Sequence, residues 1–168
     1  MFIGQAWHRG GIIPLKVQQS ILKMQHYCAD MSIEHRFRRF DATGFNDAVV
    51  ASDTFRNQWA VEDSQLLWAD CDVEFSGEMP EFEGKKPYFA WLDGRGGWCN
   101  GIFYANGNAK FFDQLQRLGE RRKLTNKYFW GSSIMNTRPG IVEPFPKIYS
   151  HSFLTTGVRN DTNVTESS

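Results

Sequence analysis

The sequence predicts a single α/β domain in which a mixed sheet is flanked by helices. Segments with strand-like and helix-like hydrophobic patterns alternate along the chain, which is typical of a sheet layered with helices. The length of 168 residues suits one domain with a sizeable core. Aromatic residues make up 15% of the chain and supply large apolar side chains for that core. We expect residues 1–157 to form the domain and the polar residues 158–168 to form a disordered tail.

The first 70 residues predict three strands and two helices in alternation. Residues 2–7 form a short apolar strand, and residues 14–27 form an amphipathic helix with a proline in its first turn. Side chains alternate over residues 33–40, which predicts a second strand. Residues 47–61 carry apolar side chains on one face and predict a helix. Residues 65–69 then form a compact apolar strand.

The second half of the chain predicts two adjacent strands, one clear helix and a final strand. Residues 76–87 are rich in Gly, Pro and Glu, as expected for an exposed loop. Residues 88–92 and 98–105 are apolar runs separated by a glycine-rich turn, so we expect two strands there. Residues 108–122 place apolar side chains on one side and predict a helix. The pattern then weakens, and residues 147–153 are expected to form the last strand.

Composition argues against several classes of function. Lys plus Arg and Asp plus Glu number 19 each, so no net field attracts nucleic acid or an anionic membrane. The three cysteines, Cys28, Cys71 and Cys99, lack the spacing of a metal finger, and we expect reduced thiols. No apolar run approaches the roughly 20 residues of a membrane span, and the first residues lack the pattern of a signal peptide. We therefore expect a cytoplasmic protein of a bacterium or of a phage-infected host cell.

Two carboxylates directly follow the strand predicted at residues 65–69. Asp70 and Asp72 are two positions apart, so in an extended segment both side chains point to one side and Cys71 points away. The carboxyl ends of strands face the crevice in which α/β sheets bind ligands. Hard oxygen ligands suit Mn²⁺ or Mg²⁺, which also take up phosphate oxygens of a substrate. We predict a cation here that bridges a diphosphate; the alternative is an ordinary surface turn.

A second polar pair lies on the helix predicted at residues 47–61. Asp53 and Arg56 are three positions apart and therefore share one face of that helix. A carboxylate can accept hydrogen bonds from sugar hydroxyls, and a guanidinium can donate to phosphate or hydroxyl oxygens. The alternative interpretation is a surface ion pair with a small effect on stability.

These two pairs belong to a longer series of motifs over residues 2–118. In chain order the motifs are Phe2-Ile3-Gly4-Gln5-Ala6-Trp7, Gly10-Gly11-Ile12-Ile13-Pro14, His26-Tyr27-Cys28-Ala29-Asp30, Phe40-Asp41, Ala51-Ser52-Asp53-Thr54-Phe55-Arg56, Asp70-Cys71-Asp72-Val73-Glu74, and Trp98-Cys99-Asn100-Gly101-Ile102-Phe103-Tyr104 followed by Phe111-Phe112. The series resembles the glycosyltransferases with a DXD-containing sugar-binding region. That family includes yeast initiating α-mannosyltransferases, capsular polysaccharide sugar transferases and, distantly, the clostridial glucosylating toxins. The resemblance rests on the order and spacing of the motifs together.

The resemblance implies a fold, an activity and a set of ligands. The fold would be a single GT-A-like, Rossmann-like domain. The activity would be transfer of a hexose from a nucleoside-diphosphate-sugar, with retention of the anomeric configuration and with Mn²⁺ (or Mg²⁺) as cofactor. The acceptor stays open between a glycan, a protein and a small molecule.

The resemblance also implies roles for individual residues. Ala6 and Trp7 would border the nucleotide base, and Asn100 would face the donor or acceptor sugar. The remaining residues would hold the donor and the metal: Asp53 and Arg56 the donor sugar and diphosphate, Asp70 the metal and the sugar or ribose, Asp72 the metal directly, and His151 the metal beside the diphosphate. Catalysis would depend on Asp70, Asp72 and Arg56.

One departure from the family pattern keeps other functions open. The family carries Gly-Gly-x-Tyr just before its Asp-x-Asp, whereas this chain has Asp63-Ser64-Gln65-Leu66-Leu67-Trp68. Glycines permit tight passage of the backbone near a ligand, so a relative that binds nucleotide-sugar without turnover is one alternative. A metal-dependent phosphoesterase that uses the same aspartates is a further alternative, although a two-metal site needs additional acidic or His ligands.

Overall fold

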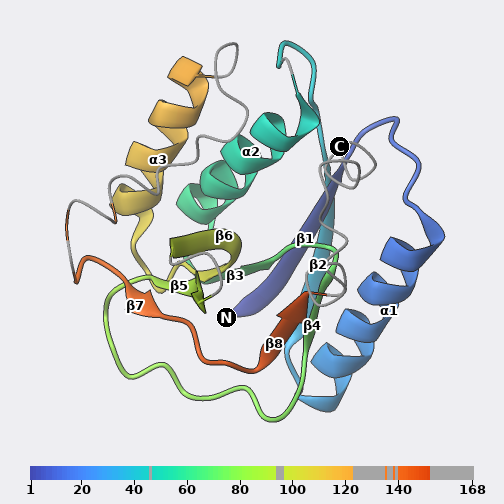
Figure 1. The fold of residues 1–168 in the computed structure, drawn as a ribbon, viewed down its shortest axis with the longest axis vertical. Helices are drawn as coiled ribbons and strands as arrows, with labels where there is room; N and C mark the ends of the chain where they lie inside the picture. Colours follow the sequence, from blue (N-terminus) through green and yellow to red (C-terminus); the bar gives the residue numbers. More distant parts are fainter. Residues whose placement is uncertain (46, 94–96, 123–134, 136–137, 139, 152–168) are drawn as a thin grey trace.

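Helices and strands alternate over the first half of the chain in the computed structural model, which describes residues 1–45, 47–93, 97–122, 135, 138 and 140–151. The elements in chain order (Figure 1) are β1 (Phe2–His8), α1 (Leu15–Asp30), β2 (Glu34–Phe40), α2 (Ala48–Glu62), β3 (Leu66–Ala69), β4 (Val73–Phe75), β5 (Tyr88–Leu92), β6 (Gly97–Tyr104), α3 (Ala109–Arg122), β7 (Glu143–Pro144) and β8 (Tyr149–His151). None of the described helices is long and apolar enough to cross a membrane.

Six of the strands form one mixed sheet in the order β2-β1-β3-β6-β5-β7. Strands β2, β1 and β3 run parallel to one another, so their carboxyl ends meet at one edge. Strand β6 is antiparallel to both β3 and β5, and β7 is parallel to β5. Strands β4 and β8 form a separate antiparallel pair. The predicted single α/β domain with a mixed sheet is confirmed.

The two faces of the sheet are covered by different helices because side chains alternate along its strands. In β1, Phe2 and Ala6 pack with Trp59 of α2 in one buried cluster, which also includes side chains of α3. Ile3, between them, packs with Met24 of α1 in a second cluster. Figure 1 shows α2 and α3 over one face of the sheet and α1 on the other side. The core therefore has two layers, one on each face.

The structure differs from the sequence-based expectation at several element ends. Helix α1 continues to Asp30, beyond the expected end, because Tyr27 and Cys28 extend its buried stripe. Strands β4 and β7 were not expected, since strands of two or three residues are too short to show a periodic pattern. Strand β8 lies inside the expected range of residues 147–153, whose last two positions are outside the described residues.

Gly4 of β1 marks a close approach of the sheet to α2. A Cβ atom at this position would collide with Leu66 Cδ1 and would come within 3.1 Å of the Trp59 ring. Both neighbours are fully buried, so neither can move freely. We expect Gly4→Ala to lower the free energy of unfolding by about 1–3 kcal/mol, the usual effect of overpacking a core. Urea unfolding measures this change, and Leu66→Val in the same chain should restore part of it; an unchanged midpoint would contradict the prediction.

Candidate functional site

A cavity opens at the edge where the parallel strands β2, β1 and β3 end. Phe40 ends β2, His8 ends β1 and Asp70 follows β3. This is the edge at which open α/β sheets bind their ligands. The cavity has a volume of about 130 Å³. Its lining comes from β1 (Ala6, Trp7, His8), α1 (Val17), β2 (Phe40), α2 (Ala48, Val49, Ser52, Arg56) and the end of β3 (Trp68, Asp70, Cys71, Asp72).

The segment Asp70-Cys71-Asp72 forms a turn, and the expectation of an extended segment is wrong. The Val73 amide donates to the Asp70 carbonyl at 3.0 Å, which closes the turn. The Asp70 amide donates to the Gly101 carbonyl at 2.8 Å and ties the turn to β6. Both Asp70 and Asp72 nevertheless line the cavity. The two carboxylates therefore reach the same cavity because of the turn, and not because side chains alternate along an extended segment.

Cys71 lies between Asp70 and Asp72 in the sequence, and its side chain is buried. Its thiol lies 3.3 Å from the carbonyl of Ala6, and the residue packs with Val17 and Ile21 of α1. Burial raises the pKa of the Cys71 thiol, and the charges of Asp70 and Asp72 raise it further. A thiol with a raised pKa is a poor nucleophile and a poor metal ligand. We therefore assign Cys71 to packing.

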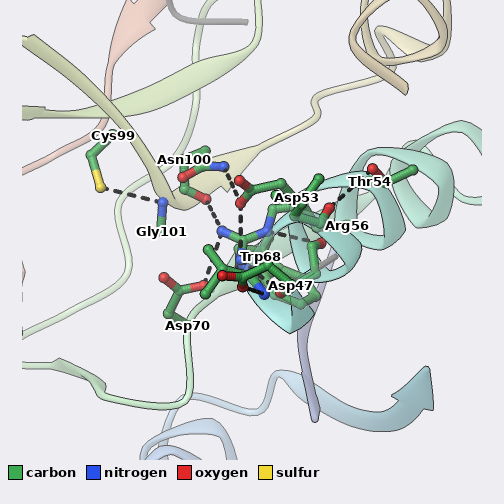
Figure 2. Close-up of polar contacts among 12 residues, drawn as sticks. Asp47, Asp53, Thr54, Arg56, Trp68, Asp70, Cys99, Asn100 and Gly101 are labelled. Carbon is green, nitrogen blue, oxygen red and sulfur yellow. Dashed lines mark hydrogen bonds and ion pairs between the residues drawn. The ribbon is translucent and has the colours of Figure 1, made fainter. Parts of the chain in front are cut away.

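The guanidinium of Arg56 is the centre of a buried polar cluster. One terminal nitrogen, Nη1, lies 3.0 Å from Asp70 Oδ1 and donates to the Asn100 carbonyl at 2.8 Å. The other, Nη2, donates to Ser52 Oγ at 2.8 Å and lies 3.5 Å from Asp53 Oδ1. Figure 2 shows the guanidinium between Asp53, Asp70 and Asn100. An Arg held from several directions is fixed in one orientation, as a preorganised binding group must be.

The ring of Trp68, a residue of β3, lies against the same guanidinium. The Arg56 Cζ atom lies 4.7 Å from the centroid of the Trp68 ring, at cation–π distance. The indole Nε1 donates to Asp70 Oδ1 at 2.8 Å, so the ring also fixes the carboxylate. Trp68 is 1% exposed and belongs to the core, as its apolar strand predicts. It lines the cavity as well, so one residue serves both core and site.

Asp53 and Asn100 lie behind Arg56 and do not line the cavity. Asn100 Nδ2 donates to Asp53 Oδ1 at 2.8 Å. The register between β5 and β6 shifts next to Asn100, and the Asn100 carbonyl and amide bond Arg56 and Asp53 of α2. Burial raises the pKa of Asp53 to about 6, although the Arg56 charge and the Asn100 hydrogen bond lower it. Asp53, Asp70 and Arg56 together carry one net negative charge when both carboxyls are ionised.

Comparison with solved structures supports the fold. The chain is similar to a structure described as "crystal structure of a glycosyltransferase involved in the glycosylation of the major capsid of PBCV-1". The TM-score is 0.61 at 11% sequence identity, and the match covers 86% of this chain and 81% of the other. The fold is like that of a GT-A glycosyltransferase. No protein-family model and no curated protein matches the sequence, so the likeness does not place the chain in a particular family.

The residues predicted from the sequence do not all reach the cavity. Ala6, Trp7, Arg56, Asp70 and Asp72 line it. Asp53 and Asn100 contact Arg56 from behind, as described above. The backbone of His151 lies in β8 opposite Val73, the residue after Asp72, but its side chain lies outside the described part of the structure.

Among the residues of the site that were not singled out from the sequence, His8 and Ser52 are polar and can take part in its chemistry. His8 lines the cavity, stacked on Trp7 with ring centroids 5.9 Å apart. Its position at the carboxyl end of the first strand could have indicated this place. Ser52 binds Arg56 through both its hydroxyl and its carbonyl. Its spacing of four residues from Arg56 on one helix was the available signal.

The donor chemistry of the cavity fits a hard divalent cation. Mn²⁺ and Mg²⁺ are usually bound by one or two carboxylates, with water and substrate phosphates as the remaining ligands. Asp70 and Asp72 provide two carboxylates at the cavity wall. Within the described residues, no three His, Cys, Asp or Glu side chains gather into a metal cluster. A cation at this place would therefore need the oxygen atoms of a bound ligand as well.

Proposed function

We propose that this chain is a glycosyltransferase that transfers a hexose from a nucleoside-diphosphate-sugar, with a divalent cation and with retention of configuration. The acceptor is a glycan, a protein or a small molecule. The main support is one observation: Arg56, Asp70 and Asp72 share a cavity at the carboxyl ends of parallel strands. The likeness of the fold to a glycosyltransferase structure agrees with this proposal.

The proposed chemistry depends on positioning and electrostatics. Asp70 and Asp72 would hold Mn²⁺ or Mg²⁺, which neutralises charge on a diphosphate when it is bound. Arg56 presents a fixed positive charge at the same wall, and such a charge stabilises a departing diphosphate without reorganisation. Ser52 and the Asn100 carbonyl keep the guanidinium oriented. Holding the donor in one geometry beside an acceptor supplies a further part of the rate enhancement.

The other residues take positions around this centre. We propose that Ala6 and Trp7, at the end of β1, border the nucleotide base, since both line the cavity. Asp53 and Asn100 hold Arg56 from behind. Their direct contact with the donor sugar, which the family resemblance implies, stays a prediction, as does metal binding by His151.

A thermal-shift screen of nucleotide-sugars with and without Mn²⁺ tests the proposal. The true donor should raise the melting temperature only together with the ion, by the equivalent of about 3 kcal/mol at 100 times its dissociation constant. Asp72→Asn should abolish this shift because it removes a cavity carboxylate. Asp113→Asn is the matched control, since Asp113 forms an exposed ion pair with Arg117 on α3. Failure of every nucleotide-sugar to bind, with or without Mn²⁺, would contradict the proposal.

Assays on the identified donor separate the remaining alternatives. Hydrolysis or transfer of the sugar supports the glycosyltransferase. Binding without hydrolysis or transfer to any acceptor indicates a protein that only holds the nucleotide-sugar. Release of phosphate or nucleotide from substrates that lack a sugar indicates a phosphoesterase.

A further inference from the structure

Gln5 is a fully buried polar residue in the middle of β1. Its side chain is 0% exposed and does not line the cavity. Its Nε2 donates to the backbone carbonyl of Asp70 at 3.2 Å. Its Oε1 lies 3.0 Å from Nε2 of His35 on β2. A chain of hydrogen bonds therefore runs across three neighbouring strands, from β2 through β1 to the end of β3.

The direction of each hydrogen bond in this chain is fixed by chemistry. The Asp70 carbonyl can only accept, so the amide nitrogen of Gln5 must face it and the amide oxygen must face His35. That oxygen can only accept, so His35 must carry a proton on Nε2. Reversing the Gln5 amide would set two acceptors against each other in a buried place. The arrangement is thus a single, directed network.

The network ends on the oxygen atom that closes the turn. The Asp70 carbonyl accepts from the Val73 amide as well as from Gln5. The same turn has a second contact with β1, between the Cys71 thiol and the Ala6 carbonyl. Two consecutive residues of β1 therefore hold the turn that carries Asp70 and Asp72.

We propose that Gln5 is a positioning residue for the two carboxylates of this turn and that His35 holds Gln5 in place. The inference rests on the proposed function, because it assigns the turn to the binding of a cation and a diphosphate. Gln5 touches neither ligand; it acts through the backbone of Asp70. Partners of this kind change metal affinity or activity by roughly 10- to 100-fold when they are replaced.

Gln5→Met tests the inference with a side chain of similar size that has no polar group. Hydrogen exchange at the Val73 amide, measured by NMR, should become at least about tenfold faster, because the turn opens more often. The Mn²⁺ concentration needed for half-maximal donor binding should rise about 10- to 100-fold. Tyr104→Phe is the control, since it removes a part-buried hydrogen bond to Gln65 at the opposite end of β3. It should change neither value.

A pair of variants at His35 covers the case in which Gln5→Met does not fold. His35→Gln keeps an N–H donor toward Gln5 and should behave like the natural chain. His35→Leu removes the donor and should reproduce faster exchange at Val73 and weaker Mn²⁺ dependence. Unchanged exchange at Val73 in both Gln5→Met and His35→Leu overturns the inference. Faster exchange with no binding of any nucleotide-sugar by the natural chain would instead overturn the proposed function and leave the positioning role of Gln5 intact.

Discussion

Replacing Arg56 by methionine is expected to lower the free energy of unfolding by about 3–5 kcal/mol, the usual effect of removing one partner from a buried ion pair. Arg56 is 5% exposed and is the positive charge between Asp53 and Asp70. Without it, the buried Asp53 carboxylate and the partly exposed Asp70 carboxylate lose their shared positive partner. The Asn100 carbonyl also loses a hydrogen-bond donor. Donor binding should fall with stability because Arg56 is the fixed cation of the cavity wall.

Urea unfolding and nucleotide-sugar binding measure the two effects. Arg117→Met is the control, because Arg117 forms an exposed pair with Asp113 on α3 and its removal should change stability by less than about 1 kcal/mol. Arg56→Lys keeps the charge but cannot reach several partners with one planar group, so it should recover only part of the loss. A decrease below about 1 kcal/mol in Arg56→Met, with donor binding intact, would show that Arg56 does not hold the cluster together.

Much of the fold could be predicted from local patterns in the sequence. Strands β1, β3 and β6 contain runs of buried residues, and helices α1 and α3 show apolar side chains at helical spacing. The pairing of β4 with β8 could not be predicted in this way. It joins Val73 with His151, which are far apart in the chain, through strands of only three residues. Long-range pairing of short strands leaves no local signal.

The candidate site, too, was predictable only where it depends on residues close together in the sequence. Asp53 and Arg56 are three positions apart on one helix, so their spacing places them together; Asp70 and Asp72 were also expected together, but a turn and not an extended segment brings them there. The link between the pairs comes from tertiary structure. The ion pair between Arg56 and Asp70 joins them. The turn at Asp70 is itself held by Gln5, 65 residues away, and by the Gly101 carbonyl. The turn at Asp70 was misjudged because its conformation is set by these distant partners and not by the apolar strand before it.

The buried cluster also suggests a conflict between stability and function. Two carboxylates and one guanidinium leave an excess negative charge, which burial penalises. A structure selected only for stability would replace one carboxylate by a neutral group. Natural proteins keep such arrangements where a ligand or a catalytic step requires them. Asp53 is the residue at which this conflict can be measured, because it is the more buried of the two carboxylates.

Asp53→Asn is therefore expected to make the protein more stable at neutral pH, by up to about 3 kcal/mol. Burial raises the pKa of Asp53 from 3.8 to about 6. Between these two pH values the folded protein therefore keeps a proton here that the unfolded chain has already released. The stability due to this proton is complete below pH 3.8 and is lost as the pH rises through about 6. Asparagine has no charge to bury, and its amide oxygen can still accept from Asn100 and Arg56. The variant should match the natural chain at acidic pH and exceed it at pH 7.

The difference between the two unfolding curves from pH 3.5 to pH 7.5 isolates this effect. Glu34 and Asp41 have lowered pKa values from hydrogen bonds with Arg36 and Thr43, and they give the opposite pH dependence. Both residues are present in both proteins, so their contributions cancel in the difference. Asp113→Asn, on the surface of α3, removes one carboxylate without touching the Arg56 cluster and controls for the change in net charge. A variant that is less stable than the natural chain at pH 7 would mean that attraction between Asp53 and Arg56 outweighs burial, and the charge excess would then carry no penalty. A more stable variant that binds the donor poorly would place Asp53 among the residues kept for function at the expense of stability.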